Sequence, residues 1–175
     1  MRDARFWSGW RRVRSCDVQS GAASFLAVAW GAGLGHDPAQ GEAVCGECLN
    51  AMRFAAMRAA RSEGGVVILS IIPPEEFNHW IGVGDIMREE ARERVHAHFE
   101  VFAKWMRDKQ GVNPELAIRE GEPVSQILTH IAEDPEIGVL VLGAGTDKKG
   151  PGPLVTQLSK SAGTLPIPIT IVPGD

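Results

Sequence analysis

The sequence has few cysteines and no long apolar run, and these absences exclude several classes of protein. Three cysteines among 175 residues are too few, and odd in number, for a disulfide framework, so we expect a reducing compartment, the cytoplasm. No apolar run reaches the roughly 20 residues that a membrane-spanning helix needs, so we expect no membrane contact. The net charge of −4 argues against a nucleic-acid partner, because a surface that binds phosphate backbones is basic.

The sequence also lacks the motifs of common catalytic sites. It contains no nucleophile elbow and no pair of carboxylates at a spacing that catalysis would use. Residues 145–150 have the glycine spacing of a P-loop, but Pro151 stands where that motif requires lysine. The histidines and cysteines do not have the spacing of a known metal site. We therefore expect neither catalytic residues nor a bound metal.

The N-terminal segment differs in composition from the rest of the chain. Hydrophobic residues make up 44% and charged residues 23% of the chain, which is ordinary for a globular domain. Up to residue 17, however, five arginines outnumber two aspartates and give a charge of +3, which leaves −7 on the remainder. We therefore divide the chain into an atypical, poorly ordered N-terminal extension, residues 1–44, and an α/β domain, residues 45–175.

From residue 47 onward, helix and strand patterns alternate along the chain. Apolar residues at steps of three or four predict helices over residues 47–63, 85–110 and 123–133. Apolar runs predict buried strands at residues 66–72 and 139–142, with a short strand at 114–119 between them. This alternation specifies a mainly parallel sheet.

A parallel sheet of this kind also needs a strand before the first helix. Only residues 25–30 are available for it, and about 16 residues then separate them from the helix, which is longer than such connections usually are. We therefore expect the first strand to be atypical or missing.

The stretch from residue 137 to the end contains a strand, a glycine-rich loop, a helix and a closing strand. Gly143 and Gly145 end the first strand, and Pro153 opens a helix over residues 154–161. A glycine-rich loop in this position presents backbone N–H groups at the carboxyl edge of the sheet, which favours phosphate. Alternation predicts the closing strand from Ile167, Ile169 and Ile171.

This pattern resembles the universal stress protein family. The resemblance covers residues 48–173 and rests on the segments AMRFAAMRAAR, VVILSII, DPEIGVLVLGAG and PIPITIV. It implies a Rossmann-like, three-layer α/β domain whose mainly parallel five-stranded sheet has the strand order 3-2-1-4-5. It also implies a role in stress response and a homodimer that pairs through the last strand, here Ile167, Ile169 and Ile171.

Many members of this family bind ATP through a glycine motif that follows the fourth strand. Gly143 matches the first glycine of that motif, whereas Thr146 replaces the second, and Thr156 and Gln157 occupy the final pair. The loop nevertheless keeps glycines and lysines of its own. An ATP-binding switch is therefore our first alternative, with candidate residues Gly143, Gly145, Lys149, Gly150, Gly152 and Thr156.

We expect a non-enzymatic module that acts by dimerisation and by contact with a protein partner that the sequence does not identify. ATP is the one cofactor that we consider, and it belongs to the first alternative. The second alternative is a thiol redox protein that uses Cys45 and Cys48, since two cysteines with this spacing at a helix start resemble a thioredoxin-like motif. We expect His130, near the end of its helix, to be exposed or to interact with the helix terminus.

Overall fold

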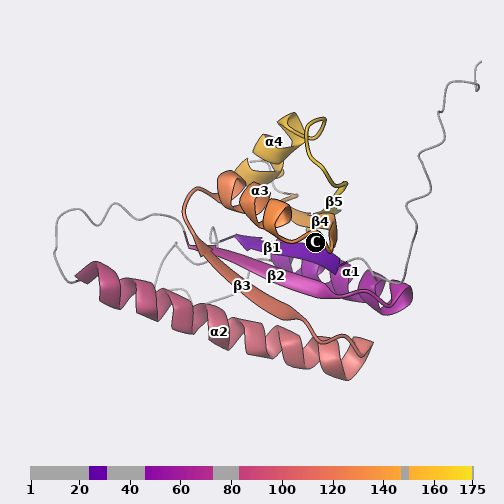
Figure 1. Cartoon of the computed structure of the whole chain (residues 1–175). Coiled ribbons are helices and arrows are strands. Elements are labelled where there is room, and N and C mark those ends of the chain that lie inside the picture. Colours follow the sequence, from indigo (N-terminus) through magenta and orange to yellow (C-terminus); the bar gives the residue numbers. More distant parts are fainter. Residues whose placement is uncertain (1–23, 31–45, 73–82, 147–149, 175) are drawn as a thin grey trace, which may run out of the picture.

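The computed structural model describes residues 24–30, 46–72, 83–146 and 150–174. Strands and helices alternate strictly along these residues (Figure 1). The elements are β1 (Ser24–Trp30), α1 (Gly46–Ser62), β2 (Val66–Ile72), α2 (Val83–Gln110), β3 (Glu115–Glu120), α3 (Pro123–Glu133), β4 (Ile137–Ala144), α4 (Pro153–Lys160) and β5 (Ile169–Pro173).

The strands form one parallel sheet in the order β3-β2-β1-β4-β5. Helices α1 and α2 cover one face of this sheet, and α3 and α4 cover the other (Figure 1). The three-layer α/β architecture and the strand order 3-2-1-4-5 are therefore confirmed.

The first strand, which we expected to be atypical or missing, lies at the centre of the sheet. β1 pairs with β2 on one side and with β4 on the other, and Phe25, Leu26 and Ala27 are buried. A central position requires an apolar strand, and the run beginning at Ser24 meets that requirement despite the long connection that follows it. The expected boundary at residue 44 thus leaves out an essential strand. The remainder of residues 1–44, and Cys45, lie outside the described residues.

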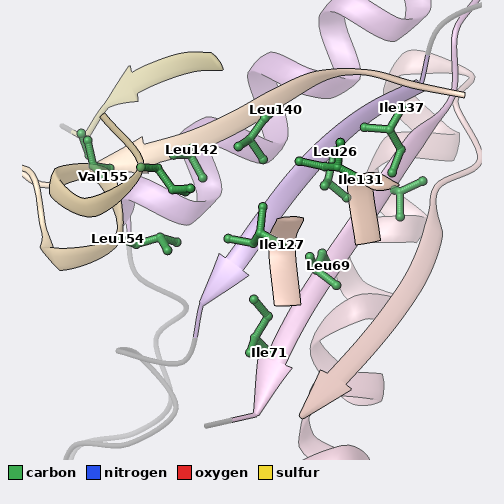
Figure 2. Packing of buried hydrophobic residues seen from close by; sticks show 13 residues of the cluster. Leu26, Leu69, Ile71, Ile127, Ile131, Ile137, Leu140, Leu142, Leu154 and Val155 are labelled. Atoms are coloured by element: carbon green, nitrogen blue, oxygen red, sulfur yellow. The ribbon is translucent and has the colours of Figure 1, made fainter. Parts of the chain in front are cut away.

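Two hydrophobic clusters hold the layers together, one on each face of the sheet. On the α3 and α4 face, branched side chains from β1, β2 and β4 pack against helical residues such as Ile127, Leu154 and Leu158 (Figure 2). On the other face, α1 contributes alanines, which are short enough to let the helix lie close to the strands. These alanines, between 0% and 1% exposed, are Ala51, Ala55, Ala56 and Ala59.

The ends of the elements follow local signals in the sequence. α3 begins with Pro123, and the Glu122 side chain accepts hydrogen bonds from the backbone N–H groups of Val124 and Ser125, at 3.2 and 2.7 Å. β5 begins at Ile169 rather than at the predicted Ile167. No helix within the described ranges is both long and apolar enough to cross a membrane.

At Gly143 on β4, the backbone of α1 lies close against the sheet. A Cβ atom added there would lie 2.3 Å from the backbone oxygen of Glu47 and 3.1 Å from the backbone nitrogen of Cys48. Both atoms belong to the first turn of α1, so neither can move aside without shifting the helix. The absence of a side chain at Gly143 therefore determines how α1 sits on the sheet.

Replacing Gly143 with alanine is expected to lower the free energy of unfolding by about 1–3 kcal/mol, the usual cost of overpacking. Urea denaturation followed by circular dichroism measures this change. Gly163→Ala is the matched control, because nothing lies within 4 Å of a Cβ atom at Gly163, and its effect should stay below about 1 kcal/mol. Equal losses in the two variants would contradict the proposed close contact.

Candidate functional site

The candidate site lies at the carboxyl edge of the sheet, between the ends of β1 and β4. These strands are neighbours, but the helix that follows β1 covers one face and the helix that follows β4 covers the other. The strand order reverses at this point, and ligands of open α/β sheets bind in the crevice that such a reversal leaves. The described residues between β4 and α4, 145–146 and 150–152, lie at this end of β4.

The structure brings four of the six predicted nucleotide-binding residues to this edge. Gly143 and Gly145 lie at the end of β4, and Gly150 and Gly152 precede α4. Gly150 and Gly152 have φ angles of 89° and 95°, a conformation that side chains rarely adopt, so these two positions require glycine. Lys149 lies outside the described residues.

The start of α4 has no side-chain cap among the described residues, and it carries an internally bonded threonine. Gly152 is the N-cap residue, and no side chain of the described residues caps the helix there. Pro153 has no N–H, so the free backbone donors of the first turn begin at Leu154. Thr156, one turn into the helix, is exposed, and its hydroxyl donates to the Gly152 carbonyl oxygen at 2.8 Å. The first turn of α4 can accept an anion, and Thr156 helps to fix the turn's shape.

Glu47 belongs to this site, although the sequence analysis did not include it. A Cβ atom on Gly174 would lie 2.8 Å from Glu47 Cγ, and one on Gly145 would lie 3.4 Å from Glu47 Oε1. The half-buried side chain of Glu47 therefore runs between two glycines toward the loop. The signal in the sequence was an acidic residue in the first turn of α1, at the edge where the strands end.

The C-terminal end of β5 is tied to this edge by two contacts. The Gly174 N–H donates to the Ala144 carbonyl oxygen at 2.7 Å, and the Asn50 side-chain amide donates to the Pro173 carbonyl oxygen at 3.4 Å. These bonds join α1, β4 and β5 around Glu47. The described part of the site is thus a packed arrangement in which the Glu47 side chain has a defined path.

Comparison with known proteins places this arrangement in a structural family. No protein-family model matches the chain, and no curated protein matches it either. Among solved structures, universal stress protein UspA from Lactobacillus plantarum aligns with a TM-score of 0.62 and 16% identity, over 86% of this chain and 97% of its own. The chain has the universal stress protein fold.

Two further structures with the universal stress protein fold contain nucleotides. One is a universal stress protein in complex with cAMP, with a TM-score of 0.52 and 16% identity, over 88% of this chain and 99% of its own. The other is a family protein from Arabidopsis thaliana with AMP bound, with a TM-score of 0.52 and 15% identity, over 87% of this chain and 92% of its own. At such identities the likeness shows the fold alone.

The cysteine pair is only half described. Cys48 lies half-buried in the first turns of α1 and packs against the cluster on the α1 and α2 face, whereas Cys45 lies outside the described residues. The redox alternative that uses Cys45 and Cys48 therefore stays a prediction. Within the described residues, no group of three or more histidine, cysteine or acidic side chains could hold a metal ion.

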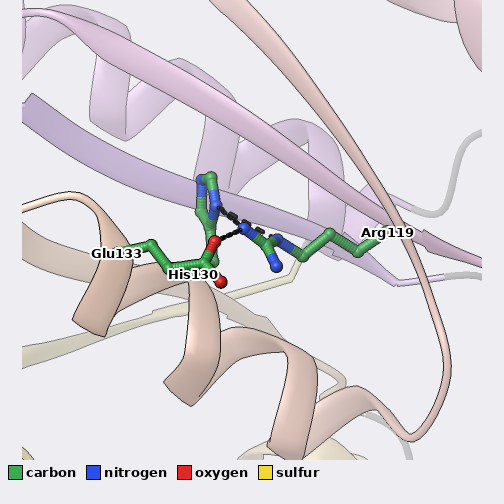
Figure 3. Close-up of polar contacts among 3 residues, drawn as sticks. All are labelled: Arg119, His130 and Glu133. Atoms are coloured by element: carbon green, nitrogen blue, oxygen red, sulfur yellow. Dashed lines mark hydrogen bonds and ion pairs between the residues drawn. The ribbon is translucent and has the colours of Figure 1, made fainter.

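A second polar cluster lies between α3 and β3, which β2 separates from β1 in the sheet. Figure 3 shows Arg119 reaching from β3 to His130 and Glu133 on α3. The guanidinium contacts His130 Nδ1 through Nε at 3.2 Å and through Nη2 at 3.0 Å, and it forms an ion pair with Glu133. The expectation that His130 is exposed or interacts with the helix terminus is wrong, because Arg119 draws the ring against the sheet.

His130 is held in its neutral form by its surroundings. Arginine can only donate, so Nδ1 accepts and the ring proton is on Nε2. Nε2 is buried and has no hydrogen-bond partner within the described residues. Burial lowers the pKa of His130, and the Arg119 charge lowers it further, while Asp134 and Glu133 oppose the shift. Protonation of His130 would place two cations in direct contact.

The depressed pKa of His130 predicts a loss of stability in acid. Because the folded-state pKa lies below the unfolded value of about 6.5, this group contributes stability above that pH and loses the contribution as the pH falls. We expect the unfolding free energy of the wild type to fall more steeply between pH 7.5 and pH 5.5 than that of His130→Gln. His96→Gln, at an exposed position on α2, should keep the wild-type dependence. Identical pH profiles for wild type and His130→Gln would refute this assignment.

Proposed function

We propose that the chain is a universal-stress-protein-like module that acts in the cytoplasmic stress response as a homodimer. In this proposal it catalyses no reaction and works through contacts with a protein partner. The observation that carries the proposal is an uncharged edge strand on a universal stress protein fold. The fold supplies the family context, and the edge supplies a surface for pairing.

The two outermost strands of the sheet, β3 and β5, differ in charge, as this proposal requires. β3, at one edge, carries Glu115, Arg119 and Glu120, and charges on an edge strand oppose pairing with another sheet. β5, at the other edge, has the sequence ITIVP and no charged residue. An uncharged edge exposes backbone groups that a second copy of the strand can satisfy, so β5 is the favoured pairing site.

The predicted dimer residues take different positions along this edge. Ile167 and Ile169 are half-buried and pack against the chain's own core cluster, whereas Ile171 is 45% exposed. Of the three, Ile171 therefore presents the largest apolar surface to a partner. In the proposed dimer, the backbone of β5 supplies hydrogen bonds and Ile171 supplies apolar contact.

Ile171→Lys is expected to weaken the homodimer at least tenfold, because it places like charges on two paired strands. A tenfold change in the dissociation constant corresponds to about 1.4 kcal/mol. Sedimentation velocity across a concentration series measures the dissociation constant. Val101→Lys is the matched control: Val101 is an apolar residue on α2 that is 68% exposed, and its replacement should leave the dimer intact. A monomeric wild type, or a dimer that only Val101→Lys disrupts, would contradict the proposal.

The second candidate function is an ATP-binding switch at the loop between β4 and α4. It is favoured by the uncapped start of α4 and by the nucleotides in two structures with the same fold. Two features oppose it: the family motif is matched at Gly143 alone, and the Glu47 carboxylate lies against the loop.

A further inference from the structure

We infer that the outward face of α1 is a docking surface for an acidic segment of a protein partner. The inference rests on the proposed function and deepens it, because it gives the chemistry of the partner that this function requires. It does not depend on the dimer. The surface consists of the exposed side chains Arg53, Met57, Arg58 and Arg61, so it combines positive charge with an apolar centre.

The helix places these side chains opposite the sheet. The inward face of α1 carries the alanines that pack on the strands. Arg53, Met57 and Arg61 follow one another at steps of four residues, so they form one stripe along the outside of the helix. The stripe is about 12 Å long, because a helix rises roughly 1.5 Å per residue. Arg58 lies one turn before Arg61 and widens the stripe.

The arginines of this surface have no counter-charge within the described chain. No described residue forms a hydrogen bond or ion pair with the side chain of Arg53, Arg58 or Arg61. The positions three and four residues away on α1, where a helix places a pairing carboxylate, hold none. The carboxylate of α1 itself is Glu47 in the first turn, and Glu63 follows the helix. The positive charge of the stripe is therefore available to a partner.

The neighbouring helix α2 has the charge pattern of a face that meets only water. Its exposed basic residues alternate with acidic ones, as is typical of a solvated helix. Lys104 pairs with Asp108 at 2.6 Å, and Arg107 pairs with Glu100 at 3.7 Å. The outward face of α1 differs because its charges have one sign.

The helix dipole does not account for this difference. The dipole favours a basic residue in the last turn, where Arg61 lies, but its effect does not extend to Arg53 in the middle of α1. A guanidinium is well suited to carboxylates, since it can donate to both carboxylate oxygens at once. Met57, 42% exposed between the arginines, offers an adaptable apolar contact. The matching partner presents acidic, apolar and acidic residues at the same spacing.

A protein segment matches this surface better than other anions do. The chain has a net charge of −4, and the long-range field of an acidic protein repels a polyanion such as a nucleic acid. A membrane surface requires a wide apolar face, whereas Met57 is the one large apolar side chain that α1 exposes within its described part. A short acidic segment needs only a few arginines and one apolar contact.

The test uses a fluorescent alanine-based peptide of roughly 16 residues, long enough to be partly helical in water, with Glu, Leu and Glu at steps of four. A second peptide has Gln in place of both Glu residues. Fluorescence anisotropy measures binding to the full-length protein. We expect the wild type to bind the Glu peptide at least tenfold more tightly than the Gln peptide, and added salt should reduce this preference by screening.

Variants of α1 locate the binding surface. Arg53→Gln combined with Arg61→Gln is expected to weaken binding of the Glu peptide at least tenfold. The matched control combines Arg94→Gln with Lys109→Gln: it removes the same two charges from exposed positions on α2 and should bind as the wild type does. Met57→Gln, which keeps every charge, should weaken binding at least threefold, whereas Met57→Leu should preserve it. Circular dichroism checks that each variant is folded.

Several outcomes overturn the inference. One is a wild type that does not bind the Glu peptide at millimolar concentration. Another is an equal loss in both double variants, since net charge would then be the cause. Unchanged binding by Met57→Gln also overturns it. If duplex DNA or phosphatidylserine vesicles bind more tightly than the peptide, and the Arg53 and Arg61 variant loses that binding, the surface recognises phosphate groups and the inference fails.

Sedimentation velocity on the same proteins separates this inference from the proposed homodimer. The Arg53 and Arg61 variant should lose peptide binding and keep the dimerisation of the wild type. A monomeric wild type that binds the Glu peptide contradicts the homodimer and supports the inference. A dimeric wild type that does not bind the peptide leaves the homodimer intact and overturns the inference.

Discussion

The contact between Gly143 and the first turn of α1 is the constraint on which the rest of the structure depends. Gly143 lies in β4, next to the central strand, and has no side chain where the Glu47 backbone passes. This contact brings α1 close enough for its alanines to pack on the sheet. It also positions the Glu47 side chain at the point where the strand order reverses. A glycine that serves packing therefore determines the chemistry of the candidate site.

The sequence predicted the elements whose signals are local. β2 and β4 are continuous apolar runs, and α3 and α4 begin at prolines that tolerate the first helical position. β1 was undervalued because the long connection after it concealed its role; only the sheet shows that Ser24–Trp30 fills the central gap. Glu47 and the Arg119–His130 contact were missed because each depends on side chains from different elements that meet only in the folded domain, and no local pattern encodes such pairs.

The Arg119 cluster shows how a sheet edge is secured without a large apolar contact. β3 lies at the edge, and its Ala117 is only partly buried against the cluster on the α3 face. Arg119 bridges from this strand to His130 and Glu133, so α3 is tied to the edge by polar groups. The cost is a buried Nε2 without a partner in the described chain, a group that is expensive to desolvate. At β3, charge both secures α3 and discourages pairing with another sheet.

The glycines at the carboxyl edge of the sheet are explained without a ligand. Gly143 is explained by the approach of α1, and Gly145 and Gly174 are explained by the path of Glu47. Gly150 and Gly152 are required by their backbone conformation. Once packing or backbone conformation accounts for each glycine, the likeness to structures that contain nucleotides supports the fold and not the ligand.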